Sequence, residues 1–212
     1  MSKTGELLRL AEIVRVKEAA LRDAVAKQRE PGGDARWQSA AESFNVAMAN
    51  FDSFRQFDVS KVRLHAEPDF TNAMLLVEAR PYCHRSGYAI VEACYALANC
   101  SKLTPAEKKS LHKVIITMIL EPRAREMWPV GRLAFAVWSE RLCDELMAMS
   151  DGSRLPEGEK FSERPNFWGG ESYTPAGLNS LDWSRGSSLA QRAAAILEIV
   201  EHQRRTVEFA TT

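Results

Sequence analysis

The stretch that decides the fold runs from Thr4 to Arg29 and reads TGELLRLAEIVRVKEAALRDAVAKQR. Its apolar residues recur every three or four positions, which is the spacing of one face of an α-helix. Oppositely charged side chains pair at the same spacing on the other faces. Glu18 is the exception, because it stands inside the apolar stripe. We predict one long amphipathic helix whose stripe consists of Leu7, Leu10, Ala11, Val14, Leu21 and Val25.

A tight turn follows this helix. Residues 31–33 read Pro-Gly-Gly, a combination that ends helices, and Asp34 is expected to cap the helix that comes next. Because two amphipathic helices joined by a short loop pack antiparallel, we predict a helical hairpin over residues 1–57. The second helix is predicted over residues 35–56, with Trp37, Ala41, Phe44, Met48 and Phe51 on its apolar face.

The central part of the chain, residues 68–149, continues the helical pattern after a less regular link. Thr104 and Glu107 form the ends of a capping-box sequence with a proline between them, which is typical of a helix start. A second segment, residues 87–99, is apolar nearly all round and is expected to be buried on most sides. The predicted helices cover residues 70–79 (ended by Pro81), 87–99, 105–120 and 129–149.

Residues 150–187 show neither a helical nor a strand period. They hold 6 of the 11 glycines, yet they are also rich in aromatic residues, so we predict an ordered arm laid over the helices. A last helix is expected over residues 188–209, opened by a capping sequence at Ser188. Since strand-like alternation does not emerge, the predicted fold is all-α: a single-domain multi-helix bundle over residues 1–212.

Charge and hydropathy narrow the class of protein. The 28 Lys and Arg residues equal the 28 Asp and Glu residues, which excludes a uniformly basic nucleic-acid coat and an acidic tail protein. The densest apolar run is far shorter than the roughly 20 residues that span a bilayer. We therefore expect a cytoplasmic protein with no membrane contact, whose four cysteines are free thiols.

The segment Arg80-Pro81-Tyr82-Cys83-His84-Arg85-Ser86-Gly87-Tyr88 gathers the most functional side chains. It precedes a predicted helix, whose N-terminal N–H groups favour an anion, and arginine adds planar recognition of phosphate or carboxylate. One hypothesis is a site for an anion or a partner. The other is an interhelical turn in which Ser86 is a cap and the arginines pair with carboxylates. The candidate binding residues are Arg80, Tyr82, His84, Arg85 and Tyr88.

The charge is unevenly distributed along the chain. Residues 80–125 carry 8 basic and 3 acidic residues, a local charge of +5, whereas residues 126–212 carry 9 basic and 13 acidic residues, a local charge of −4. The acidic arm could neutralise the basic helices. Alternatively, the basic segment forms a patch for nucleic acid or another polyanion. The residues expected in such a patch are Lys108, Lys109 and Lys113, together with the turn at Arg80 and Arg85.

Catalytic and metal-binding patterns are weak. Cys83 and His84 are adjacent, and adjacent side chains rarely point at each other as a nucleophile and its base must. The cysteine spacings do not match the closely spaced ligand pairs of zinc sites, and the glycine-rich nucleotide motifs are missing. We therefore assign no catalytic residue, no metal and no cofactor from the sequence.

The sequence favours a non-enzymatic interaction or regulatory protein that binds a protein partner or itself. Phe167 and Trp168 in the arm are a candidate partner surface. Nucleic-acid or phosphate-ligand binding through residues 80–125 is the first alternative. An enzyme with a site around Arg80, His84 and Tyr88 is the second, since pockets assemble from residues that no linear motif reveals.

Overall fold

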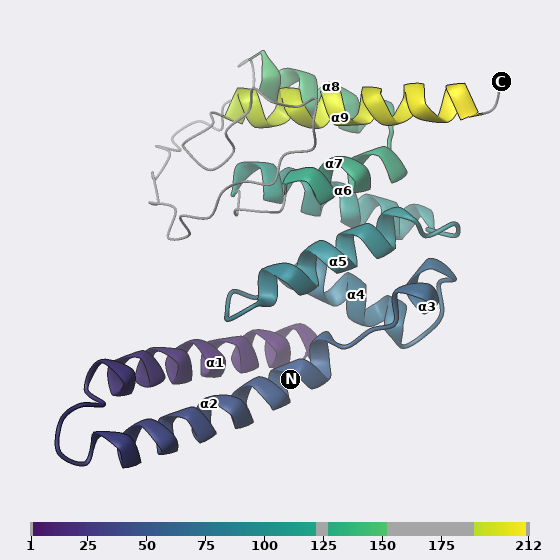
Figure 1. The fold of residues 1–212 in the computed structure, drawn as a ribbon. Coiled ribbons are helices and arrows are strands. Elements are labelled where there is room, and N and C mark those ends of the chain that lie inside the picture. Colours follow the sequence, from purple (N-terminus) through teal and green to yellow (C-terminus); the bar gives the residue numbers. More distant parts are fainter. Residues whose placement is uncertain (1, 122–126, 152–188, 211–212) are drawn as a thin grey trace. The chain divides into compact units, whose positions relative to one another are not determined.

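The structure is a computed structural model that describes residues 2–121, 127–151 and 189–210 (Figure 1). These residues form helices and turns without any strand, which confirms the predicted all-α class. The chain divides into two compact units, Met1–Lys102 and Leu103–Thr212, and each is described by itself. The grouping of all residues into a single domain stays a prediction.

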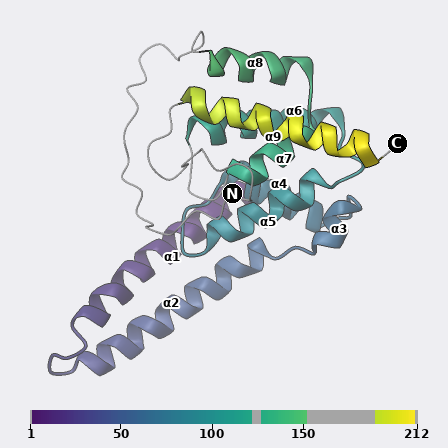
Figure 2. The same cartoon turned by 45° about the horizontal axis from the view of Figure 1, so that its top comes forward.

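The first unit opens with the predicted hairpin. Helix α1 covers Lys3–Ala26 and helix α2 covers Gly33–Arg55, and the two lie side by side in both views (Figures 1 and 2). The stripe of α1 is buried only in its first half, whereas Val25 near the turn is exposed. The buried residues of the hairpin helices are Leu7, Leu10, Ala11, Val14, Gly33, Ala47 and Phe51.

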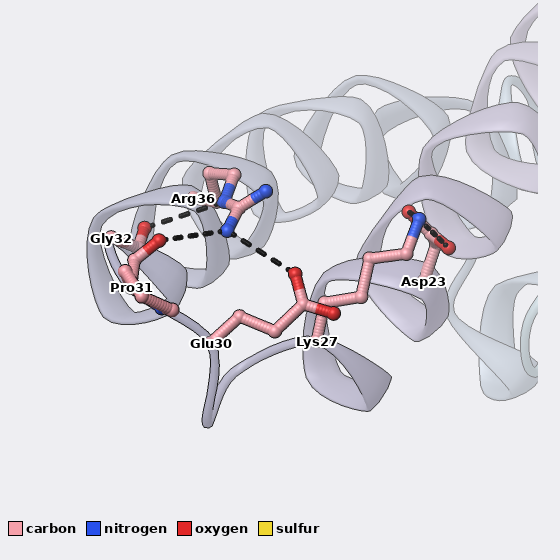
Figure 3. A network of polar contacts seen from close by, with 6 residues as sticks. All are labelled: Asp23, Lys27, Glu30, Pro31, Gly32 and Arg36. Carbon is pink, nitrogen blue, oxygen red and sulfur yellow. Dashed lines mark hydrogen bonds and ion pairs between the residues drawn. The ribbon is translucent and has the colours of Figure 1, made fainter.

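The start of α2 corrects one expectation. Its N-cap is Gly32, whose φ of +73° is left-handed, so Asp34 lies one residue inside the helix and does not cap it. Asp34 instead accepts a hydrogen bond from Gln28 Nε2 at 3.1 Å. Arg36 holds the turn together, because it donates to the carbonyl oxygens of Gly32 and Pro31 (Figure 3).

Charged pairs stabilise the outer faces of α1, as the spacing predicts. Glu12 and Arg15 approach to 2.7 Å, and Asp23 and Lys27 approach to 2.8 Å near the turn (Figure 3). These side chains are well exposed to solvent, so water and salt screen each pair and its contribution to helix stability is small.

Three further helices complete the first unit. Helix α3, Val59–Arg63, is a single short turn capped by the Asp58 side chain, and the sequence pattern did not reveal it. Helices α4, Asp69–Ala79, and α5, Ser86–Ala98, pack together and lie close to their predicted positions. As expected, most faces of α5 are buried.

The second unit contains α6, Pro105–Leu120, and α7, Met127–Ala136, followed by α8, Glu140–Ser150, and α9, Leu189–Ala210. The capping box of α6 is confirmed by reciprocal hydrogen bonds between Thr104 and Glu107. The prediction of one continuous helix over residues 129–149 is wrong, because two helices occupy this range. The chain breaks it at Ser139, whose hydroxyl accepts a hydrogen bond from the Leu142 N–H and so starts α8.

Several predictions fall outside the described residues. These are almost all of the arm at residues 150–187, the partner surface at Phe167 and Trp168, and the capping residue Ser188.

Candidate functional site

The turn between α4 and α5 has an unusual backbone. Arg80 and Arg85 bracket it with φ values of +44° and +58°, which place two residues other than glycine in the left-handed region. Each such residue costs on the order of 1 kcal/mol, so the turn persists only because its contacts offset that strain. One of these contacts is local: the Ser86 hydroxyl accepts from the Cys83 N–H at 3.1 Å and donates to the Cys83 carbonyl at 2.9 Å.

The two arginines of the turn lie in different surroundings. The Arg80 side chain is buried, with 6% of its surface exposed, whereas Arg85 is exposed. Only Arg85 is therefore available to an anion in solution. Ser86 is the first residue of α5 and Arg85 is its N-cap residue, so Ser86 stabilises the turn without serving as the expected cap.

His84 faces the hairpin. Its Nδ1 atom lies 3.3 Å from Glu18 Oε1, and its ring meets the Phe44 ring edge-on with centroids 5.5 Å apart. Glu18 also pairs with Arg22 at 2.7 Å. This arrangement explains why an acidic residue interrupts the apolar stripe of α1: its carboxylate contacts a histidine 66 positions away along the chain.

Tyr82 and Tyr88 are both 59% exposed. Tyr88 stands at the edge of an open groove whose walls come from the α2–α3 link and the starts of α4 and α5. Sequence reasoning missed this groove, although Tyr88 and Glu92 are one helical turn apart on α5. The groove is lined by Gln56, Phe57, Asp58, Asp69, Tyr88, Ala89 and Glu92.

Three carboxylates make the groove acidic. Asp69 Oδ1 accepts a hydrogen bond from the Asp58 N–H at 2.6 Å, which ties two walls of the groove together. Hydrogen bonds from Ser60 lower the pKa of Asp58, so that carboxylate stays ionised. Lys61 approaches Asp69 only to 3.8 Å. Glu92 is exposed and makes no hydrogen bond or ion pair with any described residue. The groove therefore attracts cations.

The three residues of the expected enzyme site lie in different surroundings. Arg80 is buried, His84 contacts the hairpin, and Tyr88 borders the acidic groove. In the described ranges, no group of three or more His, Cys, Asp or Glu side chains could hold a metal ion. The four cysteines are free thiols.

The predicted lysines belong to the second unit. Lys108, Lys109 and Lys113 are all exposed on α6, and none of them forms an ion pair with another described residue. They therefore keep their charge open to solvent. Binding of a polyanion to these lysines stays a prediction.

A second shallow groove lies between α1 and α2. Its lining is dominated by small side chains, which offer little apolar area to a partner. It also lacks the aromatic ring and the carboxylates of the Tyr88 groove. The second groove is lined by Lys17, Ala20, Ala35, Arg36, Ser39, Ala40 and Ser43.

No family model, curated protein or solved structure matches this chain. Within the part of the chain that the structure describes, none of the helices has both the length and the apolar character needed to cross a membrane.

Proposed function

We propose that this is a non-enzymatic interaction protein of the cytoplasm, which binds a basic segment of a partner polypeptide in the Tyr88 groove. The observation that carries the proposal is the composition of that groove. It combines a largely exposed phenol ring, three carboxylates and a single weakly placed lysine. Neither a neutral peptide nor a phosphate group complements such a surface, whereas a cationic side chain does.

An arginine side chain fits this chemistry best. Its planar guanidinium group can stack on the Tyr88 ring and pair with the Glu92 carboxylate, which lies one turn further along α5. Its aliphatic stem would cover Phe57 and Ala89 on the groove wall. Because the groove is open and its charges are screened by salt, we expect modest affinity that falls as ionic strength rises.

The proposal is tested by fluorescence anisotropy with a labelled Gly-Arg-Gly-Arg-Gly peptide and the full chain. The matched probe replaces each arginine with citrulline, which keeps the shape and removes the charge. We expect the arginine peptide to bind at least several-fold more tightly, because only it complements the carboxylates.

Variants locate the binding. Glu92→Gln and Tyr88→Leu should each weaken the arginine peptide about threefold to tenfold, since each removes one partner of the guanidinium group. Glu42→Gln, a change at an exposed glutamate of α2, is the control and should have no effect. Equal binding of both peptides, or equal loss in all three variants, would contradict the proposal.

A second candidate function is polyanion binding by α6. The three lysines Lys108, Lys109 and Lys113 are exposed and form no ion pairs among the described residues, which favours it. A short single-stranded RNA should bind weakly, because few phosphates are neutralised, and its affinity should fall modestly as the salt concentration rises.

Charge reversal tests this second candidate. The double variant Lys108→Glu/Lys109→Glu should abolish the salt-dependent RNA binding measured by gel shift. The control Lys3→Glu/Arg29→Glu makes the same change in net charge at exposed positions outside α6 and should retain it. Loss of binding in both double variants would show that only net charge matters, and the lysine surface would then be rejected.

A further inference from the structure

Helix α5 leaves one narrow side open to solvent. Within Ser86–Ala98 the exposed residues are Tyr88 and Glu92, and the N-cap residue Arg85 is exposed as well. These three residues stand at positions i, i+3 and i+7, so they follow one another along a single side of the helix. We call them the α5 face. All of this face belongs to the first unit.

The α5 face carries two opposite charges that are not neutralised within the first unit. Neither Arg85 nor Glu92 forms a hydrogen bond or an ion pair with a described residue. They are seven positions apart, which is about 10 Å along a helix and too far for direct contact. On α1, in contrast, residues at a shorter spacing do pair, as Glu12 and Arg15 do at 2.7 Å. The spacing on α5 therefore leaves both charges available to another molecule.

This arrangement of charges is complementary to itself. Two copies of a helix that are related by a perpendicular twofold axis run antiparallel, and residues equally far from the axis on opposite sides meet. An axis beside Tyr88 places Arg85 of each copy next to Glu92 of the other, which forms two identical ion pairs. The two Tyr88 rings, each on a residue that is 59% exposed, then meet at the centre and can stack with an offset.

The acidic groove favours the same arrangement. Its lining contains Glu92 and two further carboxylates, Asp58 and Asp69, but no basic side chain. The guanidinium group of a second copy would supply the missing positive charge. An unrelated basic peptide would also do so, but it would leave the charge of Arg85 unmatched. Since the formal charge of the chain is zero, two copies approach each other without overall repulsion.

We propose that the α5 face is a self-association surface, through which two copies of the chain form an antiparallel dimer held by two Arg85–Glu92 ion pairs. This inference rests on the proposed function, because Arg85 of the second copy takes the place of the basic segment in the Tyr88 groove. The surface is small and its ion pairs are open to water. The dimer is therefore weak, and it dissociates as salt is added.

The experiment is sedimentation velocity of the full chain over a range of protein concentrations. The wild type should show a rising fraction of dimer. In Arg85→Glu and in Glu92→Arg, like charges meet at both pairs, so the dissociation constant of each variant alone should rise about tenfold or more. An equimolar mixture of these two variants restores both ion pairs, because one copy then carries two acidic and the other two basic side chains. The mixture should therefore dimerise about as well as the wild type.

Two controls isolate the effect of position from that of net charge. Arg29→Glu and Glu42→Arg make the same changes in net charge at exposed positions of the hairpin, and each alone should dimerise like the wild type. Circular dichroism shows whether every variant is folded. If Arg85→Glu does not fold, Glu92→Gln provides the second test, and it should weaken the dimer about threefold to tenfold because both ion pairs are lost.

A wild type that stays monomeric at every concentration, or a mixture that dimerises no better than its components, would overturn the dimer. Anisotropy with the Gly-Arg-Gly-Arg-Gly peptide separates this inference from the proposed function. Arg85 does not line the groove, so Arg85→Glu should lose the dimer and still bind the peptide. A monomeric wild type that binds the peptide would contradict only the dimer, whereas a charge-dependent dimer that does not bind the peptide would contradict only the broader function.

Discussion

At the scale of single residues, Glu18 shows what a helical pattern can and cannot predict. Its position inside the apolar stripe was evident from the sequence, but its contact with His84 was not, because a partner 66 positions away is set by tertiary packing. The burial of Arg80, in contrast, had no counterpart in the sequence pattern. Arg80 was expected in a binding site with Arg85, yet it is buried, and burial of an arginine has no signal in a local pattern.

The strain in the α4–α5 turn leads to a prediction at this scale. Arg85 has a φ of +58° and an exposed side chain, so this residue can be substituted with little loss of side-chain contacts. Arg85→Gly should leave the free energy of unfolding unchanged or raise it by up to about 1 kcal/mol, because glycine adopts this conformation without strain. Arg85→Val should lower it by about 1–2 kcal/mol, because a β-branched residue is poorly tolerated there.

Urea denaturation of the two Arg85 variants measures the difference. The valine variant should unfold at a clearly lower urea concentration than the glycine variant. Equal midpoints would mean that the backbone at this position is not strained.

At the scale of secondary-structure elements, features set by neighbouring residues were predicted correctly, whereas a break between two helices and one short helix were missed. The capping box at Thr104 and Glu107 was correct because all of its interactions lie within one helical turn. The split between α7 and α8 was missed, since the apolar residues on both sides of Ser139 continue with nearly helical spacing. Helix α3 was missed because five residues are too few for a period to emerge.

Close packing of α7 against α9 leads to a prediction about glycine. A Cβ atom added at Gly131 would lie 2.5 Å from Ile199 Cγ2, a distance at which the isoleucine side chain or the helix that carries it must shift. Gly131→Ala should therefore lower the free energy of unfolding by about 1–3 kcal/mol, the usual cost of overpacking.

Gly87 in the first turn of α5 is the matched control. A Cβ atom there would meet nothing within 4 Å. Gly87→Ala should raise the free energy of unfolding by about 0.4–1 kcal/mol, because alanine restricts the unfolded chain. Thermal unfolding followed by circular dichroism distinguishes the Gly131→Ala variant from the Gly87→Ala variant. A Gly131→Ala protein as stable as the wild type would show that α7 and α9 are not packed this closely.

At the scale of the whole molecule, the formal charge of zero conceals an acidic groove and a lysine-rich helix. Residues 1–70 are balanced, with 11 basic and 11 acidic residues, so the sum along the chain gave no sign of the groove. Folding brings Asp58, Asp69 and Glu92 into the lining of one groove, which includes no basic side chain, and Lys61 approaches Asp69 only to 3.8 Å. Tyr88 was the one groove residue selected from the sequence. Its carboxylate neighbours could not be predicted, because three separate segments supply the walls.

The most direct test of the groove is an NMR titration of the ¹⁵N-labelled full chain with the Gly-Arg-Gly-Arg-Gly peptide. We predict saturable chemical-shift changes at the amides of Phe57, Tyr88, Ala89 and Glu92, which the citrulline peptide does not produce and which diminish as salt is added. Shifts that do not saturate, that scatter over the protein, or that appear equally with the citrulline peptide would contradict binding of a basic segment in the Tyr88 groove.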